Sequence, residues 1–177
     1  MRFADKMRKA FFKGRVFDFT VENVTLPNGV NVDLEIIRHP GASAIVPVNT
    51  NDEVVMLRQY RHAVGHAFWE IPAGTIEAEE APLNCAKREL AEETGLSAEH
   101  WESLGTVTPL PAYSDERIHL FLARGLAPSP QSLDPDEIIE VHPIPLHKVV
   151  EMILGGEIED AKTIAAIFRT LHRTGSL

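Results

Sequence analysis

The sequence has little cysteine and no long apolar stretch, and each shortage excludes a class of protein. Cys85 is the single cysteine in 177 residues, so the chain can form no internal disulfide, and no Cys/His spacing typical of zinc sites is present. This usage of cysteine favours a reducing compartment, and we expect a cytoplasmic protein. Because no apolar run is long enough to cross a bilayer, we expect no membrane span.

Basic residues are also scarce relative to acidic ones. The chain has 17 Lys and Arg against 26 Asp and Glu, which gives a formal net charge of −9. Such a chain is repelled by phosphate backbones and anionic membrane surfaces, so we expect neither nucleic acid nor a membrane as partner. With 44% hydrophobic and 24% charged residues, the composition is that of an ordinary globular domain.

The first half of the chain is rich in β-forming residues that alternate between apolar and polar. Two groups of turn residues interrupt these runs, so the pattern predicts two hairpins and four antiparallel strands. The predicted strands are 16–25, 30–37, 44–48 and 54–60, and the predicted turns are 27–29 and 49–52.

The second half mixes helical and strand patterns. After an irregular stretch between Arg61 and Gly74, a helix is predicted with Pro82 in its first turn and Gly95 at its end. Further strands are predicted at 101–107, 118–123 and 138–143, and further helices at 146–154 and 160–172. This order favours an α/β or α+β fold in which helices cover both faces of a mixed sheet.

Three acidic residues of the central helix share one face. Glu89, Glu92 and Glu93 are spaced i, i+3 and i+4, so their like charges destabilise the helix by roughly 0.2–0.5 kcal/mol per pair unless a cation compensates. Mg²⁺ prefers a few carboxylate oxygens together with water and phosphate oxygens. The residues alone leave two interpretations open, which are a metal site and a solvated acidic face.

The span from Gly74 to Leu96 adds a defined spacing to these acids. It places Glu80 and the run Arg88-Glu89-Leu90 before Glu92-Glu93 and the closing Gly95-Leu96. This span resembles the Nudix box at all nine defined positions over 23 residues. The resemblance implies a Nudix hydrolase with an α/β/α sandwich, which cleaves a nucleoside diphosphate linked to another group.

The resemblance also implies a cofactor and its ligands. Mg²⁺ is expected as the cofactor, with Mn²⁺ as a substitute, and Glu89, Glu92 and Glu93 are expected to be metal ligands. Glu92 is also placed among the catalytic residues. Arg88, four residues before Glu92, can hold an acid in place, and we include it in the catalytic set.

The residues before the box resemble those of ADP-ribose pyrophosphatases and related nucleoside diphosphate sugar hydrolases. The run from Glu70 to Gly74 resembles their Glu-x-Pro-Ala-Gly lead-in, where the backbone carbonyl matching Ala73 is a further metal ligand. The arginine matching Arg61 binds the pyrophosphate, a role that suits a bidentate guanidinium. We therefore place Arg61 and Glu70 in the substrate-binding set.

A loop after the box resembles the same subfamily. Pro111 lies sixteen residues past Gly95, a position associated with ADP-ribose hydrolysis, and we assign it to substrate binding. The glutamate matching Glu116 helps to activate the attacking water. Ala112 replaces the usual glycine here, which costs about 1 kcal/mol if that position needs a positive φ.

The resemblance divides the chain into an N-terminal arm and hairpin, 1–38, and a Nudix domain, 39–177. In this subfamily the N-terminal strands commonly form a homodimer, and an aromatic residue stacks on the base, so Phe17 and Phe19 are candidates. The expected reaction converts ADP-ribose to AMP and ribose 5-phosphate. The alternatives are another small-molecule nucleotide sugar such as GDP-mannose, and a domain that senses ADP-ribose without catalysis.

Overall fold

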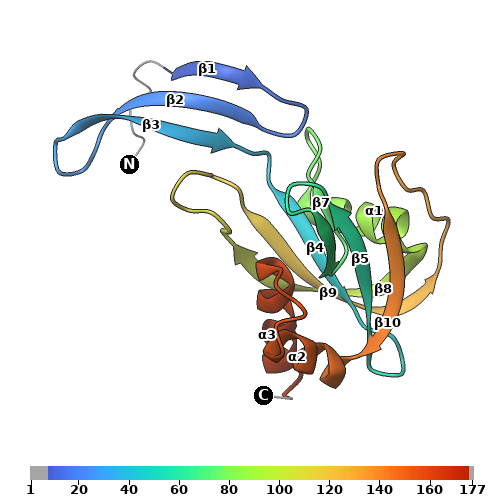
Figure 1. Cartoon of the computed structure of the whole chain (residues 1–177). Coiled ribbons are helices and arrows are strands. Elements are labelled where there is room, and N and C mark those ends of the chain that lie inside the picture. Colours follow the sequence, from blue (N-terminus) through green and yellow to red (C-terminus); the bar gives the residue numbers. More distant parts are fainter. Residues whose placement is uncertain (1–7, 176–177) are drawn as a thin grey trace.

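Residues 8–175 are described in the computed structural model, where they form ten strands and three helices (Figure 1). The strands belong to three sheets. The elements are β1 (Arg8–Lys13), β2 (Asp18–Thr25), β3 (Asn31–Arg38), β4 (Ala42–Pro47), β5 (Glu53–Arg61), β6 (His66–Glu70), β7 (Ala73–Thr75), α1 (Pro82–Thr94), β8 (Leu96–Val107), β9 (Ile118–Pro128), β10 (Ile139–Pro145), α2 (Leu146–Leu154) and α3 (Ala161–Thr174).

The central sheet is mixed, as the sequence predicts. Its order is β7-β4-β9-β8, and β4 runs parallel to β9 but antiparallel to β7. Every residue of β4 is buried, because successive side chains point to opposite faces and both faces are covered. Ala44 and Val46 belong to one core cluster, whereas Ile45 belongs to another.

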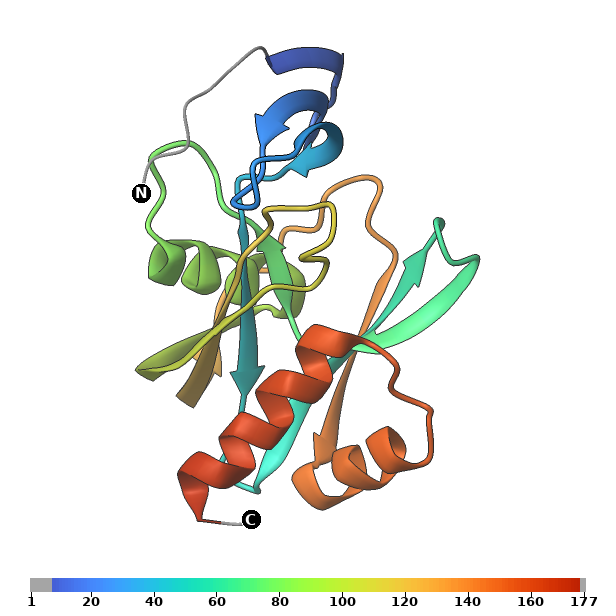
Figure 2. The same cartoon turned by 90° about the vertical axis from the view of Figure 1, so that its left-hand side faces the viewer.

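The two clusters are covered by helices on opposite faces of this sheet. Ala86 and Leu90 of α1 pack in the cluster of Ile45, and Ala166 and Ile167 of α3 pack in the other cluster. In Figure 2, α1 and α3 lie on either side of the strands. The predicted α/β/α sandwich is therefore confirmed.

The helix α1 begins and ends at the residues that the sequence predicts. Pro82 occupies its first turn, where a missing N–H costs nothing. Gly95 adopts φ 69° and donates its N–H to the carbonyl of Ala91, which is the left-handed ending that glycine allows without strain. The chain then turns directly into β8.

The prediction of a second hairpin is wrong. β4 lies in the central sheet, whereas β5 pairs antiparallel with β6 and β10 in a separate sheet. Only the bridge Val48–Val54 joins the two ends of the intervening turn. The turn at 49–52 is present as predicted. However, β4 is buried, so its backbone must be hydrogen-bonded along both edges, and β7 and β9 provide these partners. The stretch predicted as irregular contains the strands β6 and β7. They were not predicted because each is short and lies between glycine and proline residues.

The N-terminal strands form a third sheet, β1-β2-β3, which projects from the sandwich (Figure 1). The first predicted hairpin is confirmed as β2 and β3, and β1 adds a strand that was not predicted. Arg38 at the end of β3 contacts Asp115 at 2.8 Å, and Ile37 donates its N–H to Tyr113. These contacts attach the sheet to the loop that carries Glu116. The first seven residues of the predicted arm lie outside the described residues.

None of the helices described is long and apolar enough to cross a membrane.

Candidate active site

The acids of α1 face the short strand β7. Glu93 and Glu89 are 2% and 8% exposed, and the N–H of Ala73 donates to Oε2 of Glu93 at 2.8 Å. The carboxyl group of Glu89 lies so close to Gly74 that a Cβ on this glycine would be 1.9 Å from it. A side chain at position 74 would therefore force the end of the Glu89 side chain to move.

Arg88 connects the acids of this region. Its Nη1 donates to Glu89 at 2.5 Å and to Glu92 at 3.0 Å, and its Nε and Nη2 form a fork to Glu80 at 3.0 and 2.9 Å. Nη2 also donates to the carbonyl of Thr75 at 3.1 Å. Arg88 thus holds three carboxylates and the β7 backbone in one network, which is the positioning role expected of it.

The two enclosed acids have raised pKa values. Burial, which penalises the charged form, raises the pKa of Glu93 to about 8 and that of Glu89 to about 6. The negative charge of Glu89 raises the pKa of Glu93 further, whereas Arg61 lowers it. Burial thus disfavours the charged form of both acids.

Arg61 is the last residue of β5 and Glu70 is the last residue of the antiparallel strand β6, and their side chains form a bidentate ion pair. Nε of Arg61 donates to Oε1 of Glu70 at 2.8 Å and Nη2 donates to Oε2 at 2.9 Å. Lys162 contacts the same Oε2 at 2.5 Å. Although burial raises the pKa of Glu70, the bonds and charges of Arg61 and Lys162 outweigh it and bring the pKa to about 2. Glu70 is thus an anion whose two oxygens already have partners.

The loop with Glu116 lies beside the N-terminal sheet. Nδ1 of His39 is 3.9 Å from the carboxylate of Glu116, and the backbone N–H of Glu116 donates to the hydroxyl of Ser114. Pro111 is exposed in the turn that begins this loop. Within residues 8–175, no hydrogen bond or ion pair joins Glu116 to an acid of α1. Its catalytic role stays a prediction.

The two aromatic candidates for base stacking lie at the start of β2. Phe17 is 43% exposed, whereas Phe19 is partly buried and meets Phe11 edge-on at 6.4 Å between ring centroids. Phe17 therefore has the more accessible ring, and both assignments stay predictions.

Comparison with known proteins decides the family. Residues 37–167 match the family model described as the NUDIX domain. The chain belongs to the Nudix family. It is 39% identical over 158 residues to a methanol dehydrogenase activator of Bacillus methanolicus, which covers 88% of this chain and 85% of that protein. It is 38% identical over 162 residues to an ADP-ribose pyrophosphatase of Bacillus subtilis strain 168, which covers 90% of this chain and 88% of that protein.

A solved structure described as an ADP compounds hydrolase has the same fold. Its TM-score is 0.83 at 21% sequence identity, with 100% of this chain and 98% of that chain covered. The chain is therefore a Nudix hydrolase, similar to ADP-ribose pyrophosphatases.

Nudix proteins generally use a divalent metal, and the acids of α1 fit one by their chemistry. The carboxylates of Glu89, Glu92 and Glu93 are hard oxygen donors. The raised pKa of Glu93 means that its charged form is disfavoured by burial, and a bound cation would stabilise that charged form. Within residues 8–175, however, no three Asp, Glu, His or Cys side chains lie together in a metal-binding arrangement. Glu89 and Glu92 are instead bonded to Arg88.

Two charged residues of this Nudix site were not predicted as site residues. Glu80 accepts the fork of Arg88, and its place in the box spacing was the available signal. Lys162 is the second residue of α3 and lies 92 positions from its partner Glu70, so no local pattern could have revealed it. Only the tertiary structure brings Lys162 and Glu70 together.

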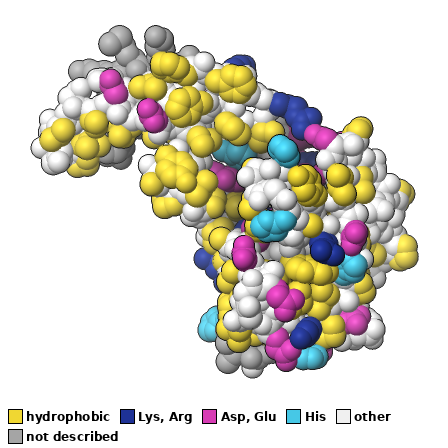
Figure 3. Space-filling view, viewed as in Figure 1, with side chains coloured by type: hydrophobic (Ala, Val, Ile, Leu, Met, Phe, Trp, Pro, Cys, Tyr) yellow, Lys and Arg dark blue, Asp and Glu magenta, His cyan; other side chains and the backbone are white. Residues whose placement is uncertain are grey.

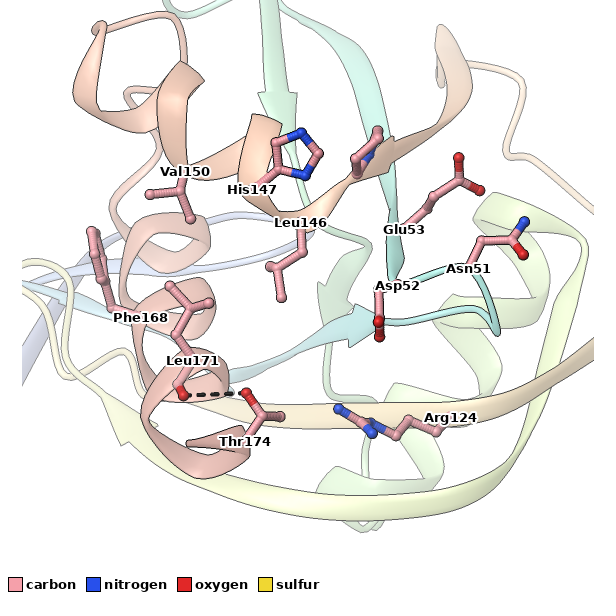
Figure 4. Close-up of a pocket in the computed structure, with 11 residues that line it drawn as sticks. Asn51, Asp52, Glu53, Arg124, Leu146, His147, Val150, Phe168, Leu171 and Thr174 are labelled. Carbon is pink, nitrogen blue, oxygen red and sulfur yellow. Dashed lines mark hydrogen bonds between the residues drawn. The ribbon is translucent and has the colours of Figure 1, made fainter. Parts of the chain in front are cut away.

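A cavity of about 700 Å³ lies away from the predicted Nudix site residues, none of which lines it. It opens between α2, α3 and the turn before β5, and Figure 4 shows Leu146, Val150, Phe168 and Leu171 along its apolar side. Asp52 and Arg124 lie at its polar side (Figure 4).

Proposed function

We propose that this Nudix hydrolase cleaves the pyrophosphate of ADP-ribose to AMP and ribose 5-phosphate, with Mg²⁺ or Mn²⁺ as cofactor. The observation that carries the proposal is the pair of enclosed acids, Glu89 and Glu93, on the box helix, with the guanidinium of Arg61 near enough to lower the pKa of Glu93. A site of this kind offers oxygen ligands for a cation beside a group that binds phosphate. The similarity to an ADP-ribose pyrophosphatase supports the choice of substrate.

In the proposed reaction, the residues of this chain bind and orient the diphosphate. Arg61 donates to its oxygens and stabilises the charge that gathers there. Arg88 keeps Glu89 and Glu92 in place, so these residues and Glu93, with the Ala73 carbonyl, would hold the metal. A bound divalent cation supplies a Lewis acid that polarises the phosphoryl oxygens and lowers the pKa of water.

The bond changes follow from attack by water. The water oxygen bonds to one phosphorus while the bond from that phosphorus to the bridging oxygen breaks. Glu116 or an acid of the box takes the proton, and the leaving phosphate carries the negative charge away. The resemblance of the loop 109–116 to that of the subfamily favours Glu116 for this role.

The N-terminal sheet supports a second part of the proposal, a homodimer through residues 1–38. Phe12, Val16 and Phe17 are 62%, 41% and 43% exposed, and Figure 3 shows hydrophobic side chains gathered over the sheet that projects from the sandwich. Exposed apolar patches of this kind mark interaction surfaces. A second copy that covers the sheet would remove them from water, and the Nudix domain, 39–177, would remain the catalytic unit.

The test of the activity is turnover on a panel of substrates. ADP-ribose, GDP-mannose, ADP-glucose and NADH are each supplied with Mg²⁺ or with EDTA, and an added phosphatase releases product phosphate for detection. We expect metal-dependent turnover with the highest kcat/KM for ADP-ribose.

Two results would contradict the proposal in different ways. A preference for GDP-mannose or another substrate of the panel would retain the hydrolase and overturn ADP-ribose as its substrate. Binding of ADP-ribose without turnover of any compound would instead favour the sensing domain, a possibility that the similarity to a methanol dehydrogenase activator keeps relevant.

A further inference from the structure

Glu70 is the centre of a four-membered charge cluster. Its side chain is 5% exposed, and it bonds to Arg61 through both oxygens and to Lys162 through Oε2. Lys162, 12% exposed, also contacts Asp160 at 3.0 Å. Two acids and two cations therefore balance, so the cluster as a whole has no net charge.

Lys162 is not the sole attachment of the start of α3 to the sheet. Asp160 caps this helix by accepting the N–H of Thr163 at 3.0 Å. The hydroxyl of Thr163 then accepts the N–H of Ile71 at 3.0 Å, which fastens the helix to the residue after Glu70. The buried side chains of Ala166 and Ile167 anchor the rest of α3. The helix therefore has attachments besides the ammonium group of Lys162, and this group can have a second role.

This second role concerns Nη1, the third side-chain nitrogen of Arg61. Nε and Nη2 are bonded to Glu70, whereas Nη1 makes no hydrogen bond within the part of the chain that the structure describes. The Arg61 side chain is 41% exposed, so Nη1 can donate to a ligand. Without Lys162, the cluster would carry one net negative charge, which repels phosphate. Arg61 would then be the sole cation that is hydrogen-bonded to Glu70 among the described residues.

We propose that Lys162 is a positioning residue, which neutralises Glu70 so that Arg61 can present Nη1 to the diphosphate. This proposal rests on the proposed function in one respect, namely that Arg61 binds the substrate's pyrophosphate. The ligand class is any nucleoside diphosphate derivative, because the contact is to phosphate oxygens and not to the base or sugar.

The experiment measures Kd by calorimetry in EDTA, where no turnover is expected, with ADP-ribose and with inorganic pyrophosphate as separate probes. We expect Lys162→Met to weaken both by about tenfold, because the cluster that presents Arg61 to the phosphate then carries a net negative charge. Lys162→Arg should restore most of the affinity. The matched control is Arg173→Met, which removes an exposed ion pair with Glu102 from the same helix and should leave both Kd values unchanged.

Two further readouts separate positioning from a structural role. With Mg²⁺ present, Lys162→Met should raise the KM for ADP-ribose about tenfold while kcat changes less than about twofold. In an Arg61→Ala background, Lys162→Met should have little additional effect on Kd, because the two residues act through one contact.

The outcomes distinguish this proposal from the proposed function. Wild-type protein that binds pyrophosphate but does not hydrolyse ADP-ribose would overturn the proposed function, and the pyrophosphate Kd of Lys162→Met would still decide the role of Lys162. An unchanged Kd in Lys162→Met, an undiminished effect in the Arg61→Ala background, or a wild-type protein that does not bind pyrophosphate would each overturn the positioning role.

Discussion

The carboxyl group of Glu89 lies against the bare α-carbon of Gly74, at a distance that leaves no room for a side chain. The two residues are fifteen positions apart, on α1 and β7, and the Glu89 carboxyl group occupies the place that a Cβ at position 74 would take. This contact places an enclosed acid next to the backbone that also bonds to Glu93.

Gly74→Ala should therefore destabilise the protein and displace Glu89. We expect a loss of about 1–3 kcal/mol in the free energy of unfolding, as for other insertions into packed sites, measured by urea denaturation. The control is the same substitution in a Glu89→Ala background, where the space is free and the cost should largely vanish. An equal cost in both backgrounds would show that Glu89 is not the obstacle.

Addition of Mg²⁺ should raise the melting temperature of the wild-type protein. The enclosed carboxylates of Glu89 and Glu93 repel one another, so a cation that binds the folded state stabilises it, by about 2.7 kcal/mol at a hundred times Kd. Glu93→Gln should lose most of this response and also lose orders of magnitude in kcat. Glu99→Gln, which alters an exposed acid of β8, serves as the control. Equal melting temperatures in Mg²⁺ and EDTA would contradict the metal site.

Glu116→Gln tests the proton acceptor. If Glu116 takes the proton from water, its amide analogue should lower kcat by about 10²–10⁴-fold with little change in KM. The kinetics are measured with ADP-ribose at saturating Mg²⁺. A variant with nearly full turnover would instead assign the proton to an acid of the box.

Glu70→Gln should destabilise the protein in a pH-dependent way. The folded-state pKa of about 2 lies below the ordinary value of 4.5, so the ionised form contributes stability above pH 4.5 that is lost as the pH falls toward 2. At pH 7 we expect a cost of about 3 kcal/mol, and at pH 3 about half of it or less. Urea denaturation of both proteins at the two pH values checks this, and a difference that does not shrink would contradict the ion pairs of Glu70.

Phe12→Asp should convert a homodimer to a monomer. The ring is 62% exposed on β1, and a carboxylate there could not be buried against a second copy. Sedimentation velocity of the variant and the wild type gives the result. Leu154→Asp, at a 76% exposed position at the end of α2, is the control. A wild-type protein that sediments as a monomer would contradict the dimer.

The sequence by itself determined the parts that depend on neighbours in the chain. Pro82 and Gly95 set the ends of α1, and the spacing of the nine defined positions from Gly74 to Leu96 indicated the family, because sequence spacing and backbone conformation are local properties. The alternation in β2 and β3 predicted their hairpin for the same reason. The burial of the site residues and the pairing of their charges could not be predicted from local sequence patterns.

The tertiary structure alone decided which distant groups meet. The turn before β5 predicts a hairpin from sequence, yet β4 pairs with β9, seventy-six positions further along at Ala42 and Ile118, because a buried strand must hydrogen-bond its backbone along both edges. Lys162 reaches Glu70 only after α3 packs on the sheet. Long-range packing fixes such contacts, and so it decided that Arg61 is held by a neutral cluster and that Glu89 lies against Gly74.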